Sequence, residues 1–125
     1  MLKVGFIGLG TMGFPIAGHI SQSYETAVFN RTTNKSQKWT SEFKGEVCES
    51  IKDLALKSNV IFLCLSEDKD IEEIILGSDG IMEHLNEETI VVDHSTTSVD
   101  TATLISNELL KKDSIFLDAP VSGGE

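Results

Sequence analysis

The sequence predicts an α/β protein in which six short strands form one parallel sheet with helices on both faces. Two patterns indicate this fold. Apolar segments of strand length alternate with helical patterns along all 125 residues. The segment Val60–Leu65 is an unbroken apolar run, which is typical of a parallel strand covered on both sides. A chain of this length suffices for one domain with a single core.

The expected strands begin at the second residue and recur along the whole chain. Right-handed crossovers between them give a doubly wound sheet of order 3-2-1-4-5-6, whose two halves meet between strands one and four. We therefore expect a ligand at the carboxyl ends of those two strands. The six strands are Leu2–Ile7, Thr26–Phe29, Glu46–Cys48, Val60–Leu65, Thr89–Asp93 and Ile115–Asp118.

The expected helices fill the intervals between the strands. In the first helix the small residues Gly13 and Ala17 permit close packing on the sheet, and in the second helix Trp39 and Phe43 share one face and predict a core contact. Ser50 followed by Asp53 resembles a capping box. The helices span Thr11–Gln22, Thr33–Phe43, Ser50–Lys57, Glu67–Leu76, Ile81–Leu85 and Val99–Lys112.

A glycine-rich turn follows the first strand and opens the first helix. Gly8 suits the tight turn, Gly10 lets a pyrophosphate approach the backbone, and Gly13 allows close packing of helix on strand. This is the dinucleotide-binding fingerprint of a Rossmann fold in its proper context. Because N–H groups in a first helical turn bind phosphates, we expect cofactor contacts from Gly8, Leu9, Gly10, Thr11, Met12 and Gly13.

The end of the second strand favours NADP over NAD. An acid that binds the adenosine ribose usually stands here, whereas this chain has Asn30, Arg31 and Thr32. Asn30 can bond a ribose without repelling a phosphate, and the guanidinium of Arg31 can bind the 2′-phosphate. The alternatives are NAD as cofactor and an ordinary surface arginine, with Thr32 or Thr33 merely capping the helix.

Further cofactor contacts are expected where strands four and five end. Leu65 and Ser66 are placed to reach the nicotinamide half of the cofactor, and a hydroxyl such as that of Thr96 could reach the nicotinamide ribose. The alternative for Ser95–Ser98 is a helix cap. For His94 we expect a structural or solvent-exposed role.

Charge and composition exclude several functions. A net charge of −10 disfavours nucleic acid as a partner, and no apolar run approaches the ~20 residues that cross a membrane. The immediate start of a strand leaves no room for a targeting peptide, which predicts a cytoplasmic protein. Cys48 and Cys64 indicate neither a disulfide nor a metal site, and we expect Cys64 in the core. The acids of residues 67–73 suggest a solvated helix face.

Four motifs together resemble the amino-terminal part of the β-hydroxyacid dehydrogenases, which include 3-hydroxyisobutyrate dehydrogenase and the glyoxylate and succinic semialdehyde reductases. They are the glycine turn, Asn30-Arg31-Thr32, the segment Asp93–Thr96 and the segment Asp118–Gly124. The resemblance implies hydride transfer between nicotinamide and a short β-hydroxyacid or its semialdehyde. It also implies cofactor contacts from Leu65, Ser66 and Thr96, and substrate binding by Ser122, Gly123 and Gly124.

The same resemblance sets the expected limits of residues 1–125, which correspond to the NAD(P)-binding domain. Family members continue into a helical domain that supplies a general acid/base lysine and much of a dimer interface, and we expect that lysine beyond Glu125. We therefore expect no catalytic residue here, little turnover from this chain alone, and self-association, with a homodimer as the expected form. The alternatives are a free-standing NADP-binding module and a non-catalytic remnant.

Overall fold

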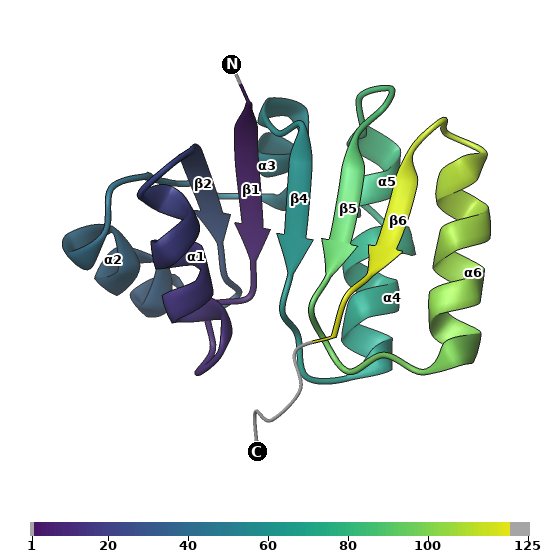
Figure 1. Cartoon of the computed structure of the whole chain (residues 1–125), viewed down its shortest axis with the longest axis horizontal. Helices are drawn as coiled ribbons and strands as arrows, with labels where there is room; N and C mark the ends of the chain where they lie inside the picture. The colour runs from purple at the N-terminus through teal and green to yellow at the C-terminus, as the bar shows by residue number, and fades with distance from the viewer. Residues whose placement is uncertain (1, 121–125) are drawn as a thin grey trace.

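The computed structural model describes residues 2–120, and it contains the predicted parallel sheet (Figure 1). The six strands lie in the order β3-β2-β1-β4-β5-β6, and every neighbouring pair is parallel. This confirms the doubly wound α/β fold and its strand order. The strands are β1 (Lys3–Ile7), β2 (Glu25–Phe29), β3 (Glu46–Val47), β4 (Val60–Leu63), β5 (Ile90–Asp93) and β6 (Ile115–Asp118).

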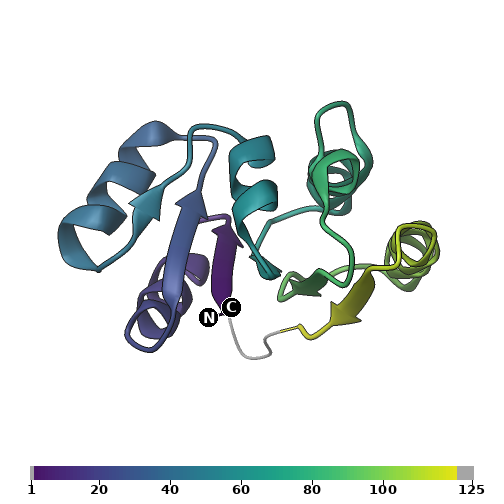
Figure 2. The ribbon, with the colours of Figure 1, turned by 90° about the horizontal axis from the view of Figure 1, so that it is seen from above.

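Helices cover the sheet from both sides, as the view from above makes clear (Figure 2). One apolar cluster, which includes Leu54, Ile71 and Ile105, joins the sheet to α3, α4, α5 and α6. A second cluster around Trp39 joins the opposite face to α1 and α2. The helices are α1 (Gly13–Ser21), α2 (Thr33–Glu42), α3 (Ile51–Lys57), α4 (Asp68–Leu76), α5 (Ile81–His84) and α6 (Val99–Leu110).

The central contact of the sheet joins the two halves of the chain. β1 pairs with β4 in the register Val4↔Val60 to Ile7↔Leu63. At the start of this pair, the side-chain oxygen of Asn59 accepts a hydrogen bond of 2.8 Å from the Lys3 amide, although the two residues are 56 positions apart. The carboxyl ends of β1 and β4 consequently lie side by side, as the strand order requires.

Most elements differ from their expected bounds by one or two residues at an end, and β4 and α1 show why. β4 ends at Leu63 rather than Leu65, because the Leu65 amide leaves the ladder and donates to the hydroxyl of Ser95 at 2.7 Å. α1 begins at Gly13 rather than Thr11, since the glycine turn occupies the residues before it. The capping prediction for α3 is confirmed, because the Ser50 hydroxyl accepts from the Asp53 amide at 3.1 Å.

Part of the sheet is open to solvent. Ile115 and Leu117 of β6 are each 49% exposed, whereas Phe116 between them is buried in the core of the opposite face. In residues 2–120 the helices α1 and α2 cover the β1–β2 side of this face but not β6. Within the same residues, no helix has the length and apolar character needed to cross a bilayer.

Candidate functional site

A cleft of about 230 Å³ opens at the carboxyl ends of β1 and β4, where the sequence predicts the ligand. The glycine turn forms one wall, the β2–α2 turn a second, and the loop after β4 together with α4 a third. Its lining residues are Ile7, Gly8, Gly10, Phe29, Asn30, Arg31, Thr32, Lys35, Cys64, Leu65, Ser66, Asp70 and Ile74.

A larger hollow of about 680 Å³ lies at the other end of β2 and β3, but its charges do not suit an anionic cofactor. The C-terminal end of α1 borders it at Ser21, and a helix C-terminus carries partial negative charge. The carboxylates of Glu25 and Glu46 add full negative charges, against one cation from Lys44. The cleft beside the glycine turn is therefore the better candidate for dinucleotide binding.

The three glycines of the turn differ in what a side chain would meet at each position. Gly8 has a φ of 101°, and a Cβ there would collide with the carbonyl oxygen of Cys64. A Cβ on Gly13 would collide with the carbonyl oxygen of Gly8, so the helix could not keep its distance from the strand. A Cβ on Gly10 would meet nothing within 4 Å and would stand in the cleft. Gly8 and Gly13 shape the turn, and Gly10 leaves space for a ligand.

The amino end of α1 follows the glycine turn, whose Gly8 and Gly10 line the cleft. Within the described chain, its N-cap residue Met12 makes no side-chain capping bond, and its first turn contains no acid. The Phe14 amide already donates to the Gly10 carbonyl at 2.9 Å and Pro15 has no N–H, so an anion at this end would meet the helix dipole and the amides of the glycine turn. Thr11 is exposed at this end, while Leu9 beneath it is buried.

Asn30 connects the glycine turn to the second wall. Its Oδ1 accepts from the Leu9 amide at 2.8 Å, and its Nδ2 donates to the Thr32 carbonyl at 3.1 Å. The side chain therefore holds two backbone segments of the cleft in register. Direct contact between Asn30 and a ribose stays a prediction.

The β2–α2 turn brings two cations to the cleft. Arg31 and Lys35 both line it, and the guanidinium of Arg31 lies 3.7 Å from Asp70 and 3.9 Å from Glu73 of α4. Thr32 is the N-cap of α2, yet in the described structure its hydroxyl makes no capping bond. The alternative in which Thr32 merely caps the helix is therefore not seen in the structure of residues 2–120.

The turn from β5 into α6 is bonded within itself. Buried Asp93 accepts hydrogen bonds from the Ser95 amide and the Thr97 hydroxyl. Ser98 caps α6 by accepting from the Thr101 amide at 3.2 Å. The capping alternative therefore holds for Ser98, whereas Ser95 instead fixes the loop after β4. Thr96 is exposed and does not line the cleft, so its cofactor contact stays a prediction.

Two other side chains near the cleft have assignable roles. His94 stacks on Phe62 with 5.5 Å between ring centroids, and its Nδ1 lies 2.8 Å from the carbonyl oxygen of Ala119. Because a carbonyl only accepts, Nδ1 carries the proton, which agrees with the structural role expected. Cys64 is half-buried: it packs against the core cluster around Trp39, as expected, and it also lines the cleft; burial raises the pKa of its thiol.

The structure assigns the site more residues than the sequence predicts. Lys35 and Asp70 line the cleft but are absent from the predicted set. One feature of the sequence could have revealed Lys35: it lies four residues after Arg31, in the first turn of α2. The acids of α4 are only partly a solvated face, because Asp68 accepts from the Ser98 amide and Glu72 from the Thr101 hydroxyl.

The last predictions fall at the carboxyl end of the chain, outside the described residues. The predicted substrate residues Ser122, Gly123 and Gly124 lie there, and so does Glu125, beyond which the family resemblance puts the catalytic lysine. Substrate binding by the three residues and the place of the lysine after Glu125 therefore both stay predictions. The predicted cofactor contacts at the cleft and the predicted lack of a catalytic residue in this chain also stay predictions.

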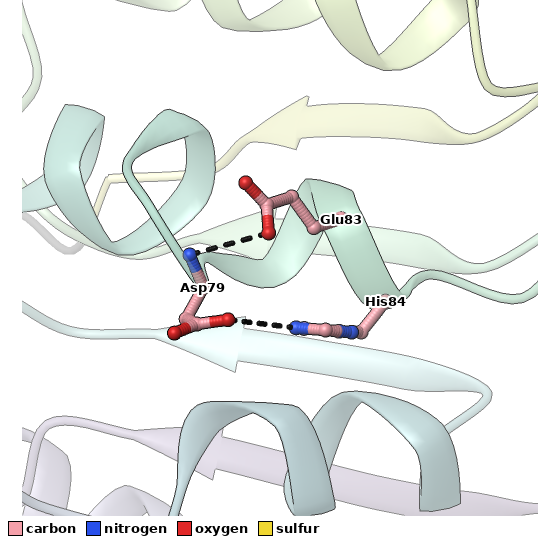
Figure 3. A group of neighbouring side chains, drawn as sticks. All are labelled: Asp79, Glu83 and His84. Atoms are coloured by element: carbon pink, nitrogen blue, oxygen red, sulfur yellow. Dashed lines mark hydrogen bonds and ion pairs between the residues drawn. The ribbon is translucent and has the colours of Figure 1, made fainter.

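A separate polar group, Asp79, Glu83 and His84, lies at the start of α5 (Figure 3). Its possible ligand atoms are within 4.8 Å of one another. Asp79 and Glu83 are exposed, the Glu83 carboxylate accepts from the Asp79 amide at 3.3 Å, and His84 Nε2 is 3.7 Å from the Asp79 carboxylate. These contacts stabilise the turn before α5, where Asp79 has a φ of 57°.

Fold and cleft together define the class: this is a dinucleotide-binding α/β domain with a glycine-rich pyrophosphate turn. Residues 3–125 match the family described as the NAD binding domain of 6-phosphogluconate dehydrogenase, and the chain belongs to that family.

Several of the relatives are named as oxidoreductases or dehydrogenases. An uncharacterized oxidoreductase of Shewanella frigidimarina is 41% identical over the whole chain, and a probable 3-hydroxyisobutyrate dehydrogenase-like 2 of Arabidopsis thaliana is 31% identical over 98% of it. The chain spans 43% and 41% of these two relatives. The structure of Psf3 in complex with NADP+ and 2-OPP superposes with a TM-score of 0.90 at 29% identity, over 97% of this chain and 43% of that one.

Proposed function

We propose that the cleft binds NADP in preference to NAD, and that the chain is the NADP-binding domain of an oxidoreductase. The reaction proposed for the whole protein interconverts a short β-hydroxyacid and its semialdehyde or keto form. The observation that carries the cofactor proposal is the pair of cations at the adenosine end: Arg31 and Lys35 line the cleft where a ribose-binding acid would otherwise follow β2.

The residues present fit a dinucleotide phosphate bridge. Gly10 leaves open space above the turn, and the amino end of α1, whose first turn contains no acid, contributes a favourable dipole. Arg31 and Lys35 would hold the 2′-phosphate, with the hydroxyl of Thr32 beside them. Leu65 and Ser66 would contact the nicotinamide half. The nicotinamide supplies hydride transfer when bound, and the chain's own residues bind and orient it.

The cofactor preference is tested by calorimetric titration with NADP+ and NAD+. NADP+ should bind about tenfold more tightly, and Arg31→Asp should reverse the order, because the change replaces the attraction for a phosphate by repulsion. Lys69→Asp is the control, since it makes the same charge change on an exposed side chain outside the cleft lining. Equal affinities of the wild-type chain for the two cofactors would refute the NADP preference.

The substrate and assembly are proposed on separate grounds. The name of the Arabidopsis relative supports a hydroxyacid substrate. Exposed Ile115 and Leu117 support self-association, as a homodimer. Sedimentation velocity at micromolar concentration should detect a dimer, and a monomer throughout would contradict it. Reduction of glyoxylate or succinic semialdehyde by residues 1–125 should be negligible, and brisk turnover would show that no acid/base group beyond Glu125 is needed.

A further inference from the structure

The adenosine end of the cleft contains an internal competitor for its own phosphate-binding arginine. Nη1 of Arg31 lies 3.7 Å from Oδ1 of Asp70, and Nη2 lies 3.9 Å from Oε2 of Glu73. Arg31 follows β2, whereas both acids belong to α4. These ion pairs therefore run across the opening between two walls of the cleft.

The two carboxylates differ in their surroundings. The side chain of Asp70 is 25% exposed and lines the cleft, whereas that of Glu73 is 72% exposed and does not. Solvent screens an exposed ion pair more strongly than a partly buried one. Asp70 is therefore the carboxylate whose charge acts on the guanidinium and on a ligand within the cleft.

This arrangement affects NADP and NAD differently. A 2′-phosphate that binds Arg31 has to replace Asp70 as the partner of the guanidinium, and it brings its own negative charge near that carboxylate. A 2′-hydroxyl has no such conflict. We propose that Asp70 determines cofactor specificity by competing with the 2′-phosphate for Arg31, so that it limits the preference for NADP. The proposal rests on the proposed binding of NADP at this cleft.

The test compares Asp70→Asn with the wild-type chain in calorimetric titrations. Asparagine keeps the shape of the side chain and removes its charge. We expect the affinity for NADP+ to rise about fivefold to tenfold and that for NAD+ to change less than about twofold. Two fragments, 2′,5′-ADP and ADP, should repeat this difference, because they contain only the adenosine end.

Two variants separate competition from a general charge effect. Glu73→Gln also removes a negative charge that is paired with the Arg31 guanidinium, but Glu73 does not line the cleft. This variant should alter the NADP+ to NAD+ affinity ratio less than about twofold. In an Arg31→Gln background, Asp70→Asn should no longer raise NADP+ affinity. An unchanged ratio in Asp70→Asn, a loss of NADP+ affinity, or the same gain without Arg31 would each overturn the proposal.

A readout without cofactor is also available, because Arg31 is the only arginine of the chain and its Nε–Hε group gives a single NMR signal. Asp70→Asn should shift this signal in the free protein more than Glu73→Gln does. If wild-type protein binds NAD+ as tightly as NADP+, the preference for NADP fails, while a raised ratio in Asp70→Asn still supports the role of Asp70. If none of the four nucleotides binds, both proposals fail.

Discussion

The two turns that lead from a strand into a helix, β1–α1 and β5–α6, satisfy their backbone groups in opposite ways. In β5–α6 the side chains do so: Asp93 accepts from Ser95, and Ser98 caps the helix. In β1–α1 the described helix start has neither a capping side chain nor an acid. The first arrangement stabilises the fold. In the second, the Phe14 amide donates to the Gly10 carbonyl and Pro15 has no N–H, so the amides offered to a ligand are those of the glycine turn. Changes in β5–α6 should therefore affect mainly stability, and changes at Gly10 mainly binding.

The largest expected effect separates two glycines of the same turn. Gly13→Ala should lower the free energy of unfolding by about 1–3 kcal/mol or more, because its Cβ would collide with the backbone of Gly8. Gly10→Ala should change stability by less than about 0.5 kcal/mol yet weaken NADP+ binding more than about tenfold, since its Cβ meets only the open cleft. Urea unfolding and calorimetric titration measure the two quantities. Equal losses of stability would remove the distinction between shaping and binding glycines.

Ser95→Ala should produce the next largest effect, a loss of about 1–3 kcal/mol in the free energy of unfolding. The Leu65 amide would lose its 2.7 Å acceptor within a partly buried loop. NADP+ affinity should fall slightly as well, because Leu65 lines the cleft. The neighbouring change Thr96→Ala is the control, and it should leave the urea midpoint unchanged because Thr96 is exposed. A Ser95→Ala protein as stable as wild type would refute the structural role of Ser95.

Ser98→Ala should cost about 1 kcal/mol of unfolding free energy through loss of the α6 cap. NADP+ affinity should not change, in contrast to Gly10→Ala. Ser98→Thr keeps a hydroxyl at the cap and should restore most of the stability. If Ser98→Ala weakened NADP+ binding as much as it weakens the fold, the proposed division between the two turns would be wrong.

The smallest effect concerns Asp68, which links α4 to the start of α6. Hydrogen bonds from Ser98 lower the pKa of the Asp68 carboxyl. A carboxyl with a lowered folded-state pKa adds stability above its unfolded pKa, and this contribution disappears as the pH falls through the folded-state value. Asp68→Asn should therefore reduce the melting temperature slightly at about pH 7 but not in strong acid. A reduction of the same size at both pH values would indicate a packing effect instead.

The sequence was sufficient for the elements and for their order, because the strand of residues 60–63 and the glycine turn have local patterns that few other structures share. It was not sufficient for the third wall of the cleft. Asp70 belongs to an acidic helix whose rotation about its own axis is set by the packing of Ile71, Ile74 and Ile75. Which acid then faces Arg31 depends on contacts between segments far apart in the chain. The inward bonds of Asn30 depend on the same tertiary arrangement.

The pairing of β1 with β4 has a consequence for quality control of folding. A chain that has formed only β1, α1 and β2 already contains the glycine turn and Arg31, but it lacks the wall from Cys64 to Asp70. To close that wall, β1 and β4 have to pair, and their contact joins residues 56 positions apart. Pairing over such a separation carries a cost in loop-closure entropy. A nucleotide that needs both walls therefore distinguishes a chain in which β1 and β4 have paired from one in which they have not, and its binding is a direct assay of that step.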